Sequence, residues 1–234
     1  MSEQSVAGSP DQEEKLKPIE TLVFLDMIPH SDNPIKITTI IMFAMPREHF
    51  PKSDTEDHKA PRDDLVLFFR DESDFSAVNI IDAFIRRQKS PVCLFSHNGN
   101  RYDFPLLMLK FNNANVSLPD DVMCADSSYA FYDIRELEPE QYGNAVRTVF
   151  YEGNPRPEAS YKLWDVFEKY KDLVEVNCSN LNRPTHDILA ALAISMFSSQ
   201  KLLNWVDKKQ RRFSEVEPTD LLYPILNQTS HLNS

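Results

Sequence analysis

The sequence predicts an α/β fold in which a mixed central sheet is flanked by helices. Apolar, β-branched runs at residues 21–27, 37–45 and 65–69 have the length and composition of buried strands. Residues 75–87 then carry apolar side chains at helical spacing and lead into a further short apolar run at 92–96, which gives the order strand, strand, strand, helix, strand. A chain of 234 residues with 41% hydrophobic residues can bury a sizeable core.

Each element in the first half has its own signal. Residues 1–17 are polar, acidic and contain Pro and Ser, which indicates a disordered tail. The run 37–45 is hydrophobic throughout, as expected of a central strand covered on both faces, and the charged stretch 51–64 is typical of a loop. The helix over 75–87 ends at Arg86 and Arg87, which suit a helix C-terminus.

The second half of the chain predicts helices separated by polar loops. Residues 104–111 resume helical spacing, with Pro105 suited to a first helical turn. Further helices are expected at 160–170, 187–197 and 201–209, with a surface loop at 136–160 and a polar loop at 177–186. Residues 214–234 are expected to form a C-terminal tail.

Charge and cysteine content limit the classes of function. The formal net charge of −11 argues against a surface generally coated for binding nucleic-acid backbones, so any such contact must be local. The three cysteines have no metal-ligand spacing, and Cys93 and Cys124 lie in strand-like runs typical of core thiols. No signal peptide and no apolar stretch of about 18 residues is present, so we expect no membrane attachment and a cytoplasmic or nuclear location.

The most informative segment follows the fourth strand. There the polar turn HNGNRYD separates the apolar run PVCLFS from the helical run FPLLMLKF, and it places Asp103 at a strand-to-helix junction. A lone Asp at such a junction is most often a helix cap.

The segment HNGNRYDFPLL resembles the second exonuclease motif of the DEDD 3′→5′ exonucleases, in the form found in the three-prime repair exonuclease (TREX) family. Other segments agree with that family in order, namely 21–27, 123–127, 160–163, 187–192 and 202–207. The resemblance covers roughly residues 20 to 213. It implies a ribonuclease-H-like exonuclease domain over residues 18–213.

The resemblance also implies a site whose ligands are incomplete. The DEDDh enzymes hold two Mg²⁺ or Mn²⁺ ions with four carboxylates and use a His as general base. The matching carboxylate positions here are Asp26, Ile28, Asp103 and Asp187, and Asn182 stands at the position of the base. Isoleucine offers no metal ligand, and an amide does not take a proton near neutral pH. Metal binding is therefore expected to be weakened or lost.

Two further sets of residues bear on this site. His186 is the only imidazole near Asp187, but neighbouring residues of a helix point to different faces, so it is a poor replacement for the base. In relatives, the turn that corresponds to His97, Asn98, Arg101 and Tyr102 helps to grip terminal nucleotides, and Arg and Tyr suit phosphate contact and base stacking.

Three functions remain open from the sequence. The first is a pseudo-exonuclease that binds a single-stranded DNA 3′ end, with RNA not excluded, or a protein partner, and has lost efficient hydrolysis. The second is a metal-dependent 3′→5′ DNA exonuclease of reduced rate. The third is a protein-interaction module without nucleic-acid binding, with a homodimer formed through the sheet edge that contains 37–45 and 65–69.

Overall fold

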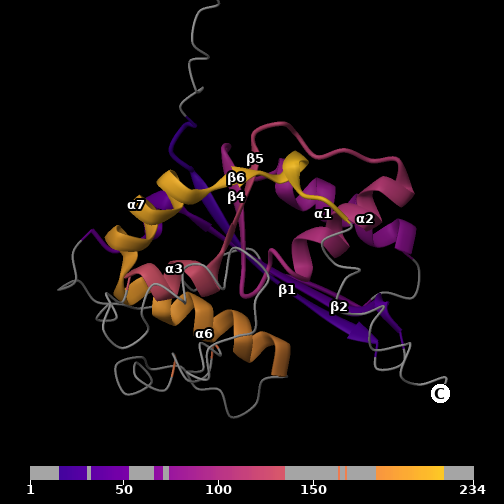
Figure 1. Ribbon diagram of the computed structural model, residues 1–234, viewed down its shortest axis with the longest axis horizontal. Coiled ribbons are helices and arrows are strands. Elements are labelled where there is room, and N and C mark those ends of the chain that lie inside the picture. Colours follow the sequence, from indigo (N-terminus) through magenta and orange to yellow (C-terminus); the bar gives the residue numbers. More distant parts are fainter. Residues whose placement is uncertain are drawn as a thin grey trace, which may run out of the picture.

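A six-stranded mixed sheet organises the chain (Figure 1). The computed structural model describes residues 16–30, 33–52, 66–70, 74–134, 163, 167 and 183–218. The strands are β1 (Thr21–His30), β2 (Asn33–Pro46), β3 (Val66–Arg70), β4 (Val92–Ser96), β5 (Val122–Asp126) and β6 (Arg211–Arg212). The α-helices are α1 (Asp74–Arg86), α2 (Asp103–Ala114), α3 (Ser127–Ile134), α6 (Arg183–Phe197) and α7 (Ser199–Lys209).

The strand order is β3-β2-β1-β4-β5-β6. Strands β1, β4 and β5 run parallel to one another, whereas β2 pairs antiparallel with β1, β3 with β2, and β6 with β5. The predicted mixed sheet flanked by helices, and the order β-β-β-α-β at its start, are therefore confirmed.

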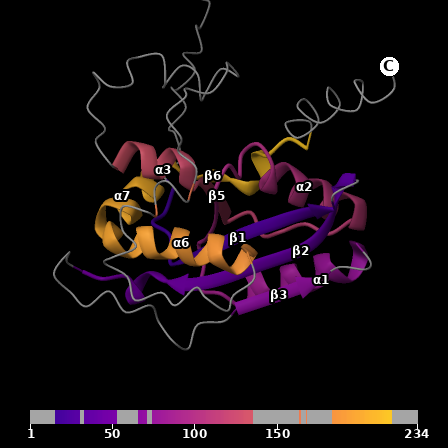
Figure 2. The ribbon, with the colours of Figure 1, turned by 90° about the horizontal axis from the view of Figure 1, so that it is seen from below.

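Helices cover both faces of the sheet, and two separate cores result. Figures 1 and 2 show α3, α6 and α7 on one side and α1 and α2 on the other. Alternate residues of a strand point to opposite faces, so Leu22 and Phe24 of β1 enter the core beneath α6 and α7, while Val23 and Leu25 enter the core beneath α1 and α2. A strand buried on both faces reads as a continuous apolar run, which is the pattern seen in the sequence.

A row of aromatic rings crosses the first core. Phe24 of β1 packs edge-to-face against Phe95 of β4, with ring centroids 5.6 Å apart, and Phe95 packs in the same way against Phe131 of α3 at 6.0 Å. Edge-to-face pairs bring the positive rim of one ring to the negative face of the next. The row therefore fixes α3 relative to the ends of β1 and β4.

Several expected boundaries are wrong. β1 continues to His30 beyond the expected end at residue 27, and β2 begins at Asn33 before the expected start at residue 37. The start of α6 differs as well. Residues 183–186 were expected to belong to a polar loop, but α6 begins at Arg183. Pro184 explains the difference, because proline is tolerated in the first turn of a helix, where its missing N–H has no intrahelical partner.

Several expected segments fall outside the described residues. They are residues 1–15 of the tail expected at 1–17, most of the loop at 51–64, the loop at 136–160, most of the helix at 160–170, residues 177–182 of the polar loop expected at 177–186, and residues 219–234 of the tail expected at 214–234. Leu163 and Phe167 are described and are buried in the core beneath α6 and α7. No helix of the described residues is long and apolar enough to span a membrane.

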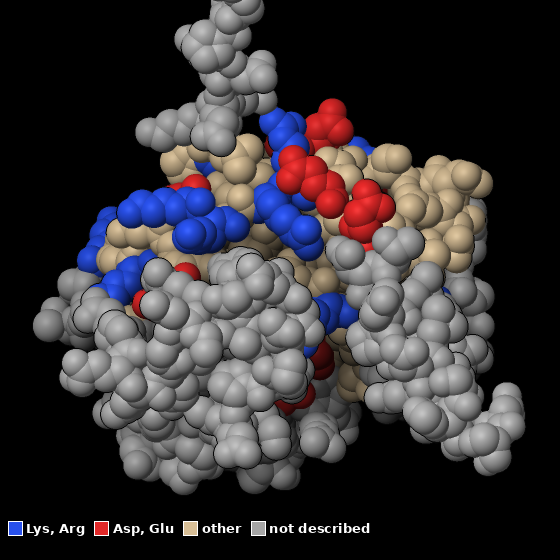
Figure 3. Space-filling model, viewed as in Figure 1, with Lys and Arg blue, Asp and Glu red and all other residues tan. Residues whose placement is uncertain are grey.

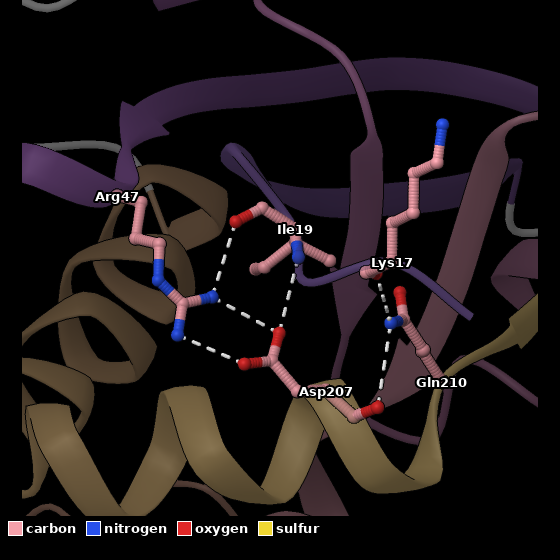
Figure 4. Close-up of polar contacts among 5 residues, drawn as sticks. All are labelled: Lys17, Ile19, Arg47, Asp207 and Gln210. Carbon is pink, nitrogen blue, oxygen red and sulfur yellow. Dashed lines mark hydrogen bonds and ion pairs between the residues drawn. The ribbon is translucent and has the colours of Figure 1, made fainter. Parts of the chain in front are cut away.

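A polar clamp ties the entrance of β1 to α7 and to the end of β2 (Figure 4). The carboxylate of Asp207 accepts hydrogen bonds from both terminal nitrogens of Arg47, at 3.0 and 2.8 Å, and from the backbone N–H of Ile19 at 3.0 Å. Gln210 donates to the carbonyl oxygen of Lys17. These contacts join segments 160 to 193 residues apart in sequence, so they fix the start of the central strand.

Replacing Asp207 with alanine is expected to lower the free energy of unfolding by about 2 kcal/mol, because three charge-assisted hydrogen bonds of a partly buried group are lost. Thermal and urea unfolding measure this change. The control is Lys89→Ala, which removes an exposed ion pair with Glu20 and should leave the unfolding midpoint unchanged. Equal effects of the two substitutions would show that the clamp does not support β1.

Candidate functional site

Three aspartates meet near the carboxyl ends of the parallel strands. Asp26 lies in β1, Asp103 is the first residue of α2 directly after the β4 turn, and Asp187 lies in the first turns of α6. The carboxyl ends of parallel strands share one edge of a sheet, and this edge is where open α/β sheets bind ligands. The structure thus brings together three of the residues that the sequence singled out.

The electrostatics of Asp26 show that these carboxyl groups interact. Burial first, and then the negative charge of Asp187, together raise the pKa of Asp26 from 3.8 to about 7, and the backbone amide of Met27 opposes the shift. A carboxyl group with a pKa near 7 is partly protonated at neutral pH. The ionised form needs a positive partner to be stable in this position.

Asp103 is the most buried of the three, with 3% of its surface exposed. Burial and then the charge of Asp26 raise its pKa well above the usual value, while a hydrogen bond from the Ser96 hydroxyl to Oδ2 opposes the shift. The backbone amide of Met27 also lowers this pKa, but the buried Oδ1 atom has no hydrogen-bond partner at hydrogen-bonding distance and angle among the described residues. A buried carboxylate oxygen without a partner is costly, and a bound cation would offset that cost.

The aspartates suit a hard divalent cation. Mg²⁺ and Mn²⁺ prefer oxygen ligands, and the unpaired oxygen of Asp103 together with the mutually repelling carboxyls of Asp26 and Asp187 provides them. Within the described part of the chain, no three His, Cys, Asp or Glu side chains surround a common point as a complete ligand set. The carboxyls are neighbours that would have to draw together around an ion.

The fourth carboxylate position of the motif is apolar here. Ile28 lies two residues after Asp26 in the same strand, with the register to β2 intact through Ile28 and Thr39, so both side chains point to the α6 face. Its carbonyl oxygen accepts a hydrogen bond from the Thr38 hydroxyl at 3.1 Å, and its side chain offers no ligand. Asn182 lies outside the described residues, and of His186 only the backbone, within α6, is described.

The turn 97–102 is held in place by Asp126, at the end of β5. Its carboxylate accepts hydrogen bonds from the backbone N–H groups of Asn98 and Asn100, at 3.0 and 3.1 Å, and from the N–H and hydroxyl of Ser128. Asn98 has a φ of 61°, a left-handed conformation that Asn tolerates better than most residues. No role for Asp126 was predicted from the sequence, although an Asp at the end of a strand and directly before Ser127 of α3 is a typical capping signal.

Close packing beneath the turn requires a glycine. A Cβ atom on Gly99 would lie 2.6 Å from the ring of Phe104 and 2.9 Å from Cβ of Ser96, much closer than real contacts. The ring of Phe104 is fully buried and cannot retreat. Gly99 therefore lets the turn approach the start of α2, where Asp103 is.

The residues expected to contact nucleotides line this turn. His97 Nδ1 lies 3.0 Å from the Ser127 hydroxyl, and its ring stacks on Phe131, at the end of the aromatic row. Burial and the charges of Asp103 and Asp26 raise the pKa of Tyr102, so its phenol stays neutral beside the aspartates. Arg101 is half-buried, and its backbone N–H donates to Asn98.

Comparison with known proteins shows several relatives. The chain is 34% identical to three-prime repair exonuclease 1 of Bos taurus over 166 residues, which cover 70% of this chain and 47% of that protein. It is 33% identical to the human protein of the same name over 147 residues, or 62% of this chain and 42% of that protein. It is 27% identical to three prime repair exonuclease 2 of Mus musculus over 233 residues, or 85% of this chain and 92% of that protein. The chain thus spans less than half the length of the first two relatives, and no family model matches it.

Solved structures agree on the fold. The zinc-bound E. coli exonuclease I complex with single-stranded DNA matches with a TM-score of 0.51 and 13% identity, covering 81% of this chain and 43% of that one. The same enzyme with an inhibitor matches with a TM-score of 0.52, covering 82% and 44%. At this identity the likeness establishes the α/β exonuclease fold.

Replacing Asp26 with asparagine is expected to stabilise the metal-free protein at pH 8. The pKa of Asp26 is about 7 in the folded chain against 3.8 otherwise, so the folded state binds more protons between these values and loses stability as the pH rises through 7. Thermal unfolding in EDTA should show a Tm several degrees higher for the variant at pH 8 and a difference that shrinks towards pH 4.

The control is Asp120→Asn, which removes a carboxylate at an exposed position outside the site. Mg²⁺ or Mn²⁺ at pH 8 should raise the Tm of the unaltered chain more than that of Asp26→Asn. A Tm difference between Asp26→Asn and the unaltered chain that is the same at pH 4 and at pH 8 would contradict the assigned burial of Asp26.

Proposed function

Because this chain is a TREX-like member of the 3′→5′ exonuclease family, we propose that it receives the 3′ end of a single-stranded nucleic acid at Asp26, Asp103 and Asp187 and hydrolyses it slowly or not at all. The observation that carries this proposal is the pairing of interacting, buried aspartates with an isoleucine on the same strand face. Binding of a 3′ end requires a held cation, which the three aspartates could provide. Hydrolysis also requires a further metal ligand and a general base, which Ile28 and Asn182 do not provide.

The three aspartates would hold one Mg²⁺ or Mn²⁺ ion. When bound, such an ion supplies a positive charge to the phosphate group at the 3′ end. Asp103 would offer its unpaired Oδ1, and Asp26 would ionise fully once a cation replaces its proton. Ser96 would keep the other oxygen of Asp103 fixed through its hydrogen bond.

Two substitutions weaken hydrolysis in this proposal. Two-metal sites clamp the attacking and leaving oxygens of an in-line displacement, and Ile28 removes a ligand on the same strand face as Asp26. Asn182, at the position of the base in the resemblance, can orient a water molecule but cannot accept its proton. Loss of a general base alone typically costs about 10²–10⁴-fold in rate.

The turn 97–102 would grip the terminal nucleotides. Arg101 offers a guanidinium for phosphate oxygens, and the neutral ring of Tyr102 beside the aspartates suits stacking with a base. His97 and Asn98 border the same turn and are held by Ser127 and Asp126. Contacts of this kind are made to the phosphate backbone and to the face of a base, which DNA and RNA share, so they would accept either nucleic acid.

Two alternatives follow from specific features. A metal-dependent DNA exonuclease of reduced rate would need the three aspartates alone to suffice. A protein-interaction module or homodimer would use β3, which is the outermost strand of the sheet among the described residues and so the place where another strand could pair. A cytoplasmic or nuclear location stays a prediction, and the buried Cys93 and Cys124 are free thiols that suit a reducing compartment.

Restoring both missing groups should raise nuclease activity more than the single changes do together. Ile28→Glu adds a ligand and Asn182→His adds a base, and both act on one water molecule, so their free energies couple. A labelled single strand with Mg²⁺ or Mn²⁺ measures the rates of the parent, each single variant and the double variant. The control is the double variant with Asp103→Asn, which should be inactive.

The parent chain should cleave this strand at least about a hundredfold more slowly than the restored variant. A parent rate equal to that of human three-prime repair exonuclease 1 on the same strand would overturn the proposed impairment. The chain would then be an efficient nuclease.

Binding of a 3′ end should depend on the turn and on a divalent ion. Arg101→Ala and Tyr102→Ala are each expected to weaken binding of a fluorescent single strand about tenfold, the loss of one phosphate or stacking contact. Arg87→Ala, at an exposed position directly after α1, is the matched control and should leave binding unchanged. Affinity that is equal in EDTA and insensitive to both turn variants would favour the protein-interaction module.

A further inference from the structure

Positive charge gathers on one surface of an otherwise acidic chain. The net charge is −11, yet residues 199–212 contain five basic residues and one acidic residue. The acidic residue, Asp207, is paired with Arg47. We define the basic strip as Lys201, Lys208, Lys209, Arg211 and Arg212, and Figure 3 shows Lys and Arg side chains gathered over α7 and β6.

The lysines of α7 lie on the exposed side of the helix. Lys201 and Lys208 are seven residues apart, about two turns, so they lie on one exposed face, opposite the buried Leu202, Leu203 and Val206. Basic residues in a last turn favour the helix C-terminus, which is a structural reason for Lys208 and Lys209. It does not apply to Arg211 and Arg212, which lie in β6.

The strip is joined to the candidate site by a direct contact. The guanidinium of Arg211 donates to the side-chain oxygen of Asn100 at 2.9 Å, and the N–H of Asn100 is held by Asp126. Asn100 directly precedes Arg101 and Tyr102. One end of the strip therefore touches the turn that would hold the terminal nucleotides, and the other end follows α7.

We propose that the basic strip binds the phosphate backbone of the strand whose 3′ end occupies the aspartate site, so that the strand leaves the turn 97–102 along β6 and α7. This inference rests on the proposed function. Lys and Arg side chains are the usual partners of phosphates, and a local strip resolves how an acidic chain can hold a polyanion. The exposed Glu215 and Glu217 lie just after β6, so they bound the strip on that side.

The test compares two fluorescent strands that share a 3′ sequence, one of four nucleotides and one of twenty. Both carry a phosphorothioate at the last linkage and are titrated in Ca²⁺ so that neither is shortened. The variant Lys208→Glu with Lys209→Glu should weaken binding of the long strand about tenfold and lower its salt slope by about 1.4, the value for two phosphate contacts of a single strand. Binding of the short strand should change less than about twofold.

Two variants serve as controls. Arg86→Glu with Arg87→Glu makes the same change in net charge at exposed positions outside the strip and should leave the long strand bound. Lys208→Arg with Lys209→Arg keeps the charge and should retain the parent affinity. Thermal unfolding of every variant identifies any loss that comes from misfolding.

Each outcome separates the strip from the site. If the long strand binds no more tightly than the short one, or if its affinity is unchanged by Lys208→Glu with Lys209→Glu, the proposed role of the basic strip is wrong and the proposed 3′-end binding is unaffected. A long strand that depends on the strip while the short strand does not bind supports the strip and overturns the proposed site. Absence of binding to both strands overturns both proposals.

Discussion

The central strand β1 imposes the constraint on which the other elements depend. It pairs with β2 on one side and β4 on the other, and its alternate side chains enter two separate cores. A slip of one residue would exchange these sets of side chains, so the two cores fix the register of the strand. The same alternation sends Asp26 and Ile28 to the face where α6 brings Asp187, and the Asp207 clamp anchors the other end of the strand.

Burial explains why the aspartate site is strained without a cation. Carboxyl groups removed from water favour their neutral form, and the pKa values of Asp26 and Asp103 are raised by burial before any effect of neighbouring charges. The fold carries this cost because clusters on both sides of β1 bury large apolar side chains. The buried aspartates thus lower the stability of the folded chain in exchange for an arrangement that can bind a ligand, which is a common pattern at functional sites.

The turn after β4 connects the site with the far edge of the sheet. Asp126 of β5 fixes the backbone of the turn, and Arg211 of β6 holds the side chain of Asn100, so two neighbouring strands determine where Arg101 and Tyr102 lie. A basic surface joined to the turn in this way can act on the same ligand as the aspartates. The acidic composition of the chain therefore describes its average surface and does not describe the charge of this basic strip.

The sequence by itself determined the sheet, the order of its first elements and the motif that contains Asp103, because buried strands and the turn HNGNRYD are local patterns. It also identified Ile28 as a position without a ligand. The start of α6 at Arg183, the role of Asp126 and the contact of Arg211 with Asn100 were decided by the tertiary structure. These features depend on residues about 25 to 110 positions apart, or on backbone groups that any residue carries. The order of side chains along the sequence does not show which hydrogen-bond donor contacts which acceptor. The raised pKa values of the aspartates likewise depend on burial and on neighbouring charges, which only the folded chain provides.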